Sequence, residues 1–207
     1  MTVSITSPEG VVNLALGRIK YRYRIGSIWE GSFAAKAALD IYGQTRDDLM
    51  RTMDWPFARR DTSLTLLKQA PSTGYVQPTV WDPTSNPPLP WIYEYQNPSD
   101  SLRIRSIRNQ DLFLINYDPR EHRFTVTNDE SYSPAQKTIL TNVGPVAVAT
   151  YTGRVTDPST WDADFVEAFA EELGRRLAPV LTDMEAAKVA AENAMRATGE
   201  ANTTQAG

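Results

Sequence analysis

The sequence predicts an α+β fold, in which helices from both ends of the chain form a bundle platform around an inserted antiparallel β subdomain. Apolar residues recur at helical spacing over about 8–60 and again over 157–182. Between them, residues 91–155 contain short β-branched and aromatic segments separated by turn signals, a pattern typical of an antiparallel sheet. An extended C-terminal arm completes the predicted architecture.

The composition indicates one globular domain, which we place at residues 1–182, followed by a C-terminal helix and tail at 183–207. The chain has 207 residues, 41% of them hydrophobic, so it can bury a core without cross-links. The absence of cysteine excludes disulfides and thiolate metal sites. A net charge of −4 argues against a globally basic surface for nucleic acid. No apolar run approaches the length of a membrane span, so we expect no membrane partner.

The first element is a helix predicted at about 8–19. Ser7 is a favourable N-cap residue, and Pro8 suits the first helical position because its missing N–H is not needed there. Apolar residues follow at helical spacing.

A second helix is predicted at about 32–53, with two candidate start sites. Ser27 with Glu30 three residues later matches a capping box, and Ser32 directly precedes an alanine-rich run. The helix is expected to end before Trp55-Pro56, because a residue that precedes proline is disfavoured in the α region.

The middle of the chain begins with a proline-rich arm, residues 71–90, whose Pro, Ser, Thr and Gly content predicts a loop. Trp81 lies within this arm, which has no means of burying it alone, so we expect Trp81 at a subunit or tail interface. Six strands are then predicted, at 91–96, 102–107, 112–117, 123–127, 138–142 and 145–155.

The C-terminal part returns to helix. Cap and proline signals at 157–160 precede aromatic and aliphatic residues at steps of four, and Pro179 is expected to kink or stop this helix. Thr182 and Glu185 form a further capping box that opens a last helix at about 183–198.

The sequence offers few groups for catalysis. The single histidine, His122, lies near Asp118 and Glu121 in a turn that contains proline. These residues can be drawn as a metal site, although a solvated turn is the more favoured interpretation because no second ligand pair occurs at regular spacing. There is no phosphate-binding loop and no nucleophile elbow. We therefore expect no enzymatic activity, no cofactor and no metal, with a small hydrolase that uses His122 as an alternative.

Basic residues are concentrated on one predicted strand. Arg103 and Arg105 alternate with Leu102 and Ile104, so the two guanidinium groups should project together. A solvated sheet face explains this pattern. A basic lining that contacts phosphate explains it as well.

Several short motifs occur in an order that resembles the phage head-to-tail adaptor family, which includes tail tubular protein A. They are LALGRI at 14–19, IWEGS at 28–32, RDDLMR at 46–51, WPFARR at 55–60, WIYEY at 91–95, PSDSLRI at 98–104 and WDADF at 161–165. The order of these motifs along the chain, rather than any one of them, makes the resemblance specific. The resemblance covers about residues 8–182.

The resemblance implies a structural virion protein, a subunit of a dodecameric ring beneath the portal that joins the capsid to the tail. Its implied partners are the portal protein, a tail or nozzle protein, other copies of itself and the double-stranded DNA that passes through the channel. The implied location is the neck of the virion, with assembly in the host cytoplasm. Among virion components, the alternative is another ring-forming protein, either a tail terminator or a tail-tube protein.

The resemblance also suggests roles for particular residues. The C-terminal extension is similar to an arm that reaches along the portal, which here would carry Met184, Val189 and Met195. In a ring with a central channel, Arg103 and Arg105 are the expected DNA-facing residues, because they share one face of a strand.

Overall fold

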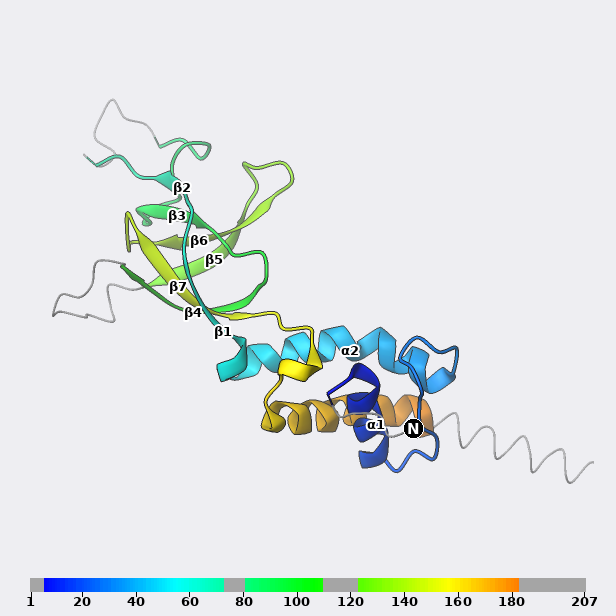
Figure 1. Ribbon diagram of the computed structural model, residues 1–207. Coiled ribbons are helices and arrows are strands. Elements are labelled where there is room, and N and C mark those ends of the chain that lie inside the picture. The colour runs from blue at the N-terminus through cyan, green and yellow to red at the C-terminus, as the bar shows by residue number, and fades with distance from the viewer. Residues whose placement is uncertain (1–5, 73–80, 110–122, 183–207) are drawn as a thin grey trace, which may run out of the picture. The chain divides into compact units, whose positions relative to one another are not determined.

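The computed structural model describes residues 6–72, 81–109 and 123–182 and shows a mixed α+β fold. The chain divides into two compact units, one formed by Met1–Leu49 with Val155–Gly207 and one formed by Met50–Arg154. The first is the helical unit and the second is the β unit (Figure 1). Among the described residues, no helix combines the length and apolar character that crossing a membrane requires.

Helix α1 spans Pro8–Arg18, as the cap signals predicted. The Ser7 hydroxyl oxygen accepts a hydrogen bond from the Gly10 N–H at 3.1 Å, which satisfies one of the free donors of the first turn. The third helical segment approaches α1 closely at Gly174, where a Cβ atom would lie only 3.0 Å from the Ala15 carbonyl oxygen. Glycine at this position therefore sets the distance between the two helices.

Helix α2 spans Phe33–Thr52, and Ser32 is its cap. The Ser32 hydroxyl oxygen accepts from the Ala35 N–H at 3.3 Å. The alternative capping box forms no helix start. Instead, the Glu30 carboxylate accepts hydrogen bonds from the N–H groups of Gly26 and Ser27, at 2.8 and 3.3 Å, and so organises the loop before α2.

The third helical segment covers residues 163–182 and follows a short 3-10 helix, η2, at Pro158–Thr160. The helix continues through Pro179, so a stop at this proline is wrong, and the alternative expectation, a kink there, stays a prediction. A proline in a helix removes one backbone hydrogen bond, and the buried Leu177 and Leu181 on either side supply packing that offsets the loss.

An aromatic cluster forms the core of the helical unit. The Phe169 ring lies 5.0 Å from the Tyr42 ring of α2 and 5.4 Å from the Trp161 ring, both in edge-to-face contact. Phe165 packs edge to face on Trp161 at 5.0 Å. Such contacts add to the free energy gained by burying the rings, so this cluster helps to hold α2 against residues 163–182.

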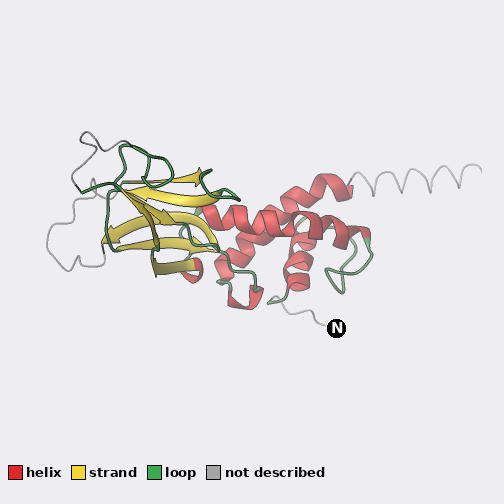
Figure 2. Cartoon of the chain, turned by 90° about the horizontal axis from the view of Figure 1, so that it is seen from above, coloured by secondary structure: helices red, strands yellow, loops and turns green. Residues whose placement is uncertain are grey.

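The β unit contains two antiparallel sheets (Figure 2). The three-stranded sheet has the order β1-β7-β4, with β1 at Arg59–Ser63, β7 at Ala147–Gly153 and β4 at Ser101–Asn109. The four-stranded sheet has the order β2-β3-β6-β5, with β2 at Leu66–Gln69, β3 at Tyr93–Gln96, β6 at Gln136–Thr141 and β5 at Phe124–Asp129. A 3-10 helix, η1, at Pro56–Ala58 leads into β1.

The structure adds two strands that the sequence did not predict. Strands β1 and β2 both lie before the proline-rich arm, and four of the five β1 residues are exposed. The predicted strand at 112–117 lies outside the described residues, and the other five described strands overlap the predicted segments.

The two sheets share one apolar core. It contains buried residues from β3, β4, β6, β7 and the loop between β6 and β7: Tyr95, Ile104, Ile107, Ile139, Val143, Ala147, Ala149 and Tyr151. The Tyr95 hydroxyl donates a hydrogen bond to the Val143 carbonyl oxygen at 3.1 Å, so this buried polar group is satisfied.

Candidate functional site

The outer face of the four-stranded sheet carries charged residues although it is covered. Strand pairing sets Lys68 opposite Glu94, and Glu94 opposite Leu140, so these three side chains share one face of the sheet. Tyr95 and Ile139 face the opposite way, into the core. The outer face of such a sheet is commonly solvated. Here both Lys68 and Glu94 are buried.

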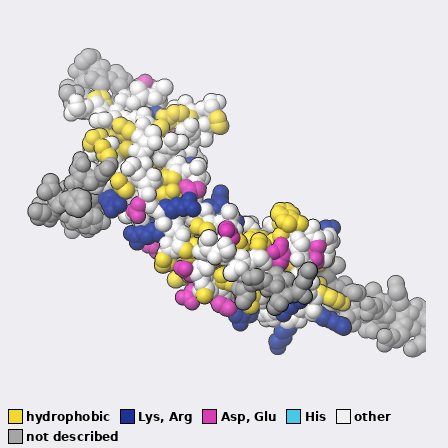
Figure 3. Space-filling model, viewed as in Figure 1, with side chains coloured by type: hydrophobic (Ala, Val, Ile, Leu, Met, Phe, Trp, Pro, Cys, Tyr) yellow, Lys and Arg dark blue, Asp and Glu magenta, His cyan; other side chains and the backbone are white. Residues whose placement is uncertain are grey.

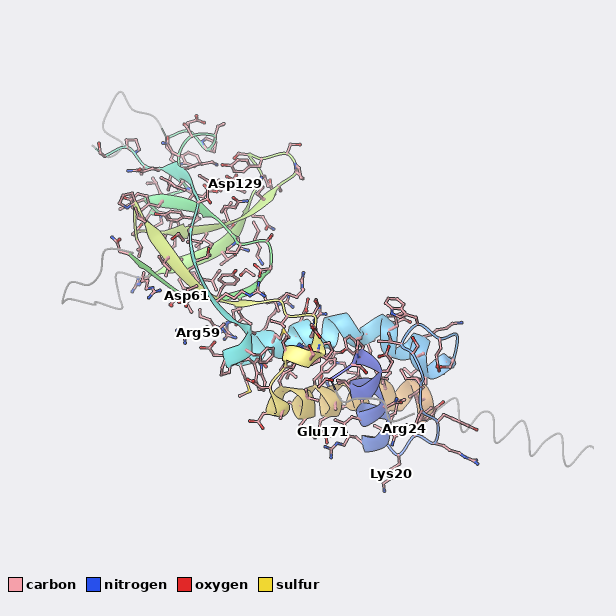
Figure 4. The ribbon with its side chains drawn as sticks, in the orientation of Figure 1. Lys20, Arg24, Arg59, Asp61, Asp129 and Glu171 are labelled. Carbon is pink, nitrogen blue, oxygen red and sulfur yellow. The ribbon has the colours of Figure 1, made fainter. Side chains whose placement is uncertain are left out.

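Lys68 connects three parts of the β unit. Its ammonium group donates hydrogen bonds to the Pro83 carbonyl oxygen at 2.9 Å, to the Ser131 hydroxyl at 2.8 Å and to the Asp129 carboxylate. Figure 4 labels Asp129, which ends strand β5. All three donors of the ammonium group are therefore occupied, and the proline-rich segment and the β5–β6 hairpin are fastened to β2.

Glu94 is the unsatisfied member of this group. Its side chain is 1% exposed, and neither carboxylate oxygen has a hydrogen-bond partner among the described residues. The nearest opposite charge is the Lys68 nitrogen, 3.6 Å from Oε2, which is an ion pair beyond good hydrogen-bond length. The neighbouring Thr138 hydroxyl is also buried without a described partner.

The pKa values of the cluster follow from burial and from these contacts. Burial raises the pKa of Glu94, and Asp129 acts in the same direction while Lys68 opposes it. Burial also acts to raise the pKa of Asp129, but hydrogen bonds from Lys68 and Ser131 outweigh it and hold that pKa at about 2. Burial alone would lower the pKa of Lys68, yet the Asp129 and Glu94 carboxylates raise it. Asp129 and Lys68 are thus charged at neutral pH.

A cavity of about 190 Å³ lies between the sheet and the proline-rich segment. One wall is formed by Trp81, Pro83, Asn86 and Pro88, and the other by Lys68, Glu94, Thr127, Asn128, Asp129 and Leu140. We call this the Glu94 pocket. It combines an apolar wall with a charged floor.

Trp81, the predicted interface residue, is part of the Glu94 pocket. Its side chain is anchored, because the indole N–H donates to the Pro87 carbonyl oxygen at 2.8 Å. The residue remains 40% exposed, so the ring contributes both to the pocket wall and to the surface. The sequence singled out Trp81 but gave no sign of Lys68, Glu94 or Asp129, because the strand register that brings them together is a long-range feature.

Arg103 and Arg105, the predicted channel residues, bind backbone carbonyl groups at the end of α2. Arg103 donates to the Arg51 carbonyl oxygen at 3.0 Å, and Arg105 donates to the Met50 and Met53 carbonyl oxygens. Arg105 also donates to the Thr152 hydroxyl at 2.8 Å, and its side chain is only 15% exposed. The last carbonyl groups of a helix lack internal partners, so these arginines have a structural role. A DNA-facing role stays a prediction.

The helical unit presents an exposed tryptophan that the sequence analysis missed as an interface residue. Trp29 is 77% exposed, in the loop that Glu30 organises. Asn13 holds the start of this loop by exchanging hydrogen bonds with the backbone of Ile25, at 2.8 and 2.9 Å. An ordered loop that exposes a large aromatic ring is a candidate contact surface.

The charges of the two units are mixed rather than separated by sign. On the face shown in Figure 3, basic and acidic side chains lie intermixed over the helical unit, and most of the β unit shows few charged side chains. In the helical unit, Arg18 pairs with Glu167 and, at 3.1 Å, with Glu171. Pairs of this exposed kind contribute little to stability.

The remaining predicted residues lie outside the described ranges, namely Met184, Val189, Met195 and the His122 turn. Within 6–72, 81–109 and 123–182, no group of three or more acidic or histidine side chains is arranged to hold a metal ion. The chain matches no protein-family model, and a search of curated proteins gave no significant match.

Proposed function

We propose that the chain is a structural, non-enzymatic subunit of a ring that joins a phage head to its tail. The ordered set of adaptor-like motifs carries this proposal. These motifs fall at defined places of the fold: 14–19 in α1, 46–51 in α2, 55–60 at the entry to β1, and 161–165 at the start of the third helical segment.

In this proposal α1, α2 and residues 163–182 form a helical platform, and residues 183–207 form an arm that binds the portal through Met184, Val189 and Met195. The β unit contacts the tail or nozzle protein. Neighbouring subunits form a ring, expected to be a dodecamer, around the passing DNA. No cofactor takes part, and the protein resides in the neck of the virion after assembly in the host cytoplasm.

A ring of identical subunits requires two different lateral surfaces on each copy. The exposed Trp29 loop of the helical unit is suited to one of them, because large aromatic residues are enriched at the centre of protein interfaces. Arg103, whose side chain remains exposed beside its hydrogen bond to Arg51, is the better placed of the two arginines to contact DNA.

The mass of the purified protein in solution, alone and after addition of the portal of the same phage, tests the proposal. We expect a form that joins the portal as a ring. A protein that ignores the portal and forms its own ring or tube would instead support a tail terminator or tail-tube protein. A chain that stays monomeric under every condition would contradict both.

A further inference from the structure

Residues 18–24, which follow helix α1 into the next loop, form a basic segment that we call the basic loop. Every second residue of this segment is an exposed cation: Arg18, Lys20, Arg22 and Arg24. No acidic residue occurs between Glu9 and Glu30. The basic loop is therefore a locally positive surface on a chain whose net charge is −4.

Lys20 has a backbone conformation that favours glycine. Its φ is 57°, and among the described residues it is the one non-glycine residue with a positive φ. The Lys20 N–H donates to the Gly17 carbonyl oxygen at 3.1 Å, and the Tyr21 N–H donates to the Leu16 carbonyl oxygen at 2.9 Å. At a helix end with this hydrogen-bond pattern the residue is commonly glycine, because a Cβ atom is strained in the left-handed region. Arg18 already places a positive charge in the last turn of α1, so the strained lysine points to a separate use for its ammonium group.

The cations of the basic loop differ in how far their charges are compensated. Arg18 pairs with two glutamates of the third helical segment, and Arg24 donates to a backbone carbonyl oxygen of α1. Lys20 and Arg22 form no ion pair with any described residue. Figure 4 shows the Lys20 side chain pointing away from the helices. Two exposed, uncompensated cations are therefore available to an anionic ligand.

Two tyrosines alternate with these cations. The Tyr21 and Tyr23 rings are in edge contact, with 5.9 Å between their centroids, and the Arg22 guanidinium lies 5.9 Å from the Tyr23 centroid. A nucleic-acid base would have to displace Arg22 in order to stack on this face of Tyr23. Lysine, arginine and tyrosine side chains all bind phosphate oxygens, and duplex DNA carries about one phosphate charge per 1.7 Å of its length. The basic loop is thus suited to phosphate groups rather than to bases.

We propose that the basic loop binds the phosphate backbone of double-stranded DNA through Lys20 and Arg22, without reading the base sequence. This site rests on the proposed function, in which the ring surrounds DNA, and it adds a contact in the helical unit to that of Arg103 in the β unit. Binding of DNA and attachment to the portal are separate measurements, so each proposal can fail without the other.

The test measures the affinity of the full-length protein for a fluorescein-labelled DNA duplex by fluorescence anisotropy, at about 50 to 200 mM salt. The double variant Lys20→Gly with Arg22→Gln should bind about tenfold more weakly, and its slope of log affinity against log salt should be smaller by about 2. Its melting temperature should stay the same or rise, because glycine relieves the strain at position 20. A lysine with only a structural role would give a lower melting temperature and an unchanged salt slope.

The matched control is the double variant Arg59→Gln with Arg175→Gln. It removes the same net charge from two exposed arginines, each of which already pairs with a carboxylate. Its affinity for the duplex should stay unchanged. An equal loss in the two double variants would overturn the proposal, because net charge alone would then explain the binding.

The unaltered protein provides further decisive outcomes, which hold even if a variant fails to fold. The absence of saturable duplex binding at about 50 mM salt would overturn the proposal. Tighter binding of a single strand of the same length, or a strong preference between two duplexes of unrelated sequence, would contradict contact with the backbone alone. Polyglutamate that displaced the labelled duplex as well as unlabelled duplex does would replace DNA with an acidic protein partner. A loss of affinity confined to Arg103→Gln would overturn this site and leave the DNA channel of the proposed function standing.

Discussion

At the scale of single residues, Lys68 and Glu94 are both buried in one cluster, but they differ in how far hydrogen bonds compensate their burial. Lys68 makes three hydrogen bonds and an ion pair, so its burial is compensated. Glu94 is equally buried and has no described hydrogen bond. Buried ionic groups stabilise a fold little as a set, whereas removal of one partner leaves the others uncompensated. Substitutions of Lys68 and of Glu94 should therefore change the free energy of unfolding in opposite directions.

Lys68→Met should destabilise the protein by about 3–5 kcal/mol, since it leaves the buried Glu94 carboxylate and the partly buried Asp129 carboxylate without their counter-ion. The methionine side chain keeps much of the volume, so the loss reports on charge and hydrogen bonding. Urea unfolding measures the effect. Lys36→Met on the exposed face of α2 is the control and should change stability by less than about 0.5 kcal/mol. A similar loss in both variants would contradict the compensated role of Lys68.

Glu94→Gln should become increasingly stabilising, relative to the unaltered protein, as pH rises. Burial raises the pKa of Glu94 above its ordinary value of 4.5, so between these two values the folded state binds more protons than the unfolded state. The stability that Glu94 contributes is therefore lost as pH rises through its folded pKa. Glutamine does not titrate, so the variant does not undergo this loss. Urea unfolding of both proteins from pH 4 to 8 checks this. A difference in unfolding free energy that stays constant over the series would show that Glu94 titrates normally.

At the scale of elements, the end of α2 depends on residues distant in sequence. The carbonyl groups of Met50, Arg51 and Met53 accept hydrogen bonds from Arg103 and Arg105 of β4. At its start, α2 uses a local device, the Ser32 hydroxyl. The start could be predicted from the sequence because the cap lies three residues from its donor. The partners at the end could not, because they lie more than 50 residues along the chain.

Arg105→Met should destabilise the β unit by about 1–3 kcal/mol, because the carbonyl groups at the end of α2 lose a charged donor. Arg108→Met is the control, since Arg108 is more exposed and approaches Asp61 at only 3.4 Å, an exposed pair of low value. Thermal unfolding followed by circular dichroism measures both. If Arg105→Met left the melting temperature unchanged, its contacts with the end of α2 would not be structural, and the channel role would gain support.

At the scale of the whole molecule, each of the two units has a core of its own among the described residues. In the helical unit, the aromatic cluster and the buried faces of the helices lie within 6–49 and 155–182. The core of the β unit lies within 50–154. A test of the portal-binding role that we propose for residues 183–207 therefore measures attachment and stability separately.

Deletion of residues 183–207 should abolish attachment to the portal and change the melting temperature little. Co-sedimentation with portal rings measures attachment, and differential scanning fluorimetry measures the melting temperature. A matched substitution series at Met184, Val189 and Met195 should weaken attachment stepwise if apolar contacts carry it. Attachment that survives the deletion unimpaired would place the portal contact elsewhere on the subunit.

Most of the local structure could be predicted from the sequence, because its signals are local. The caps Ser7 and Ser32, the period of four in residues 163–182 and the alternation along β4 each act over a few residues. Strands β1 and β2 were missed for the same reason. Strand β1 is polar and exposed, so it has no apolar alternation, and it is defined by its pairing with β7.

The sequence by itself determined the α+β class, the helix starts and most of the strands, because capping, periodicity and turn chemistry depend on neighbouring residues. Only the tertiary structure decided strand order, the burial of Lys68 with Glu94 and Asp129, and the use of Arg103 and Arg105 at the end of α2. Those features depend on which distant strands pair and in which register. Register is fixed by burying one face of each sheet in a shared core, which is a property of the folded chain as a whole.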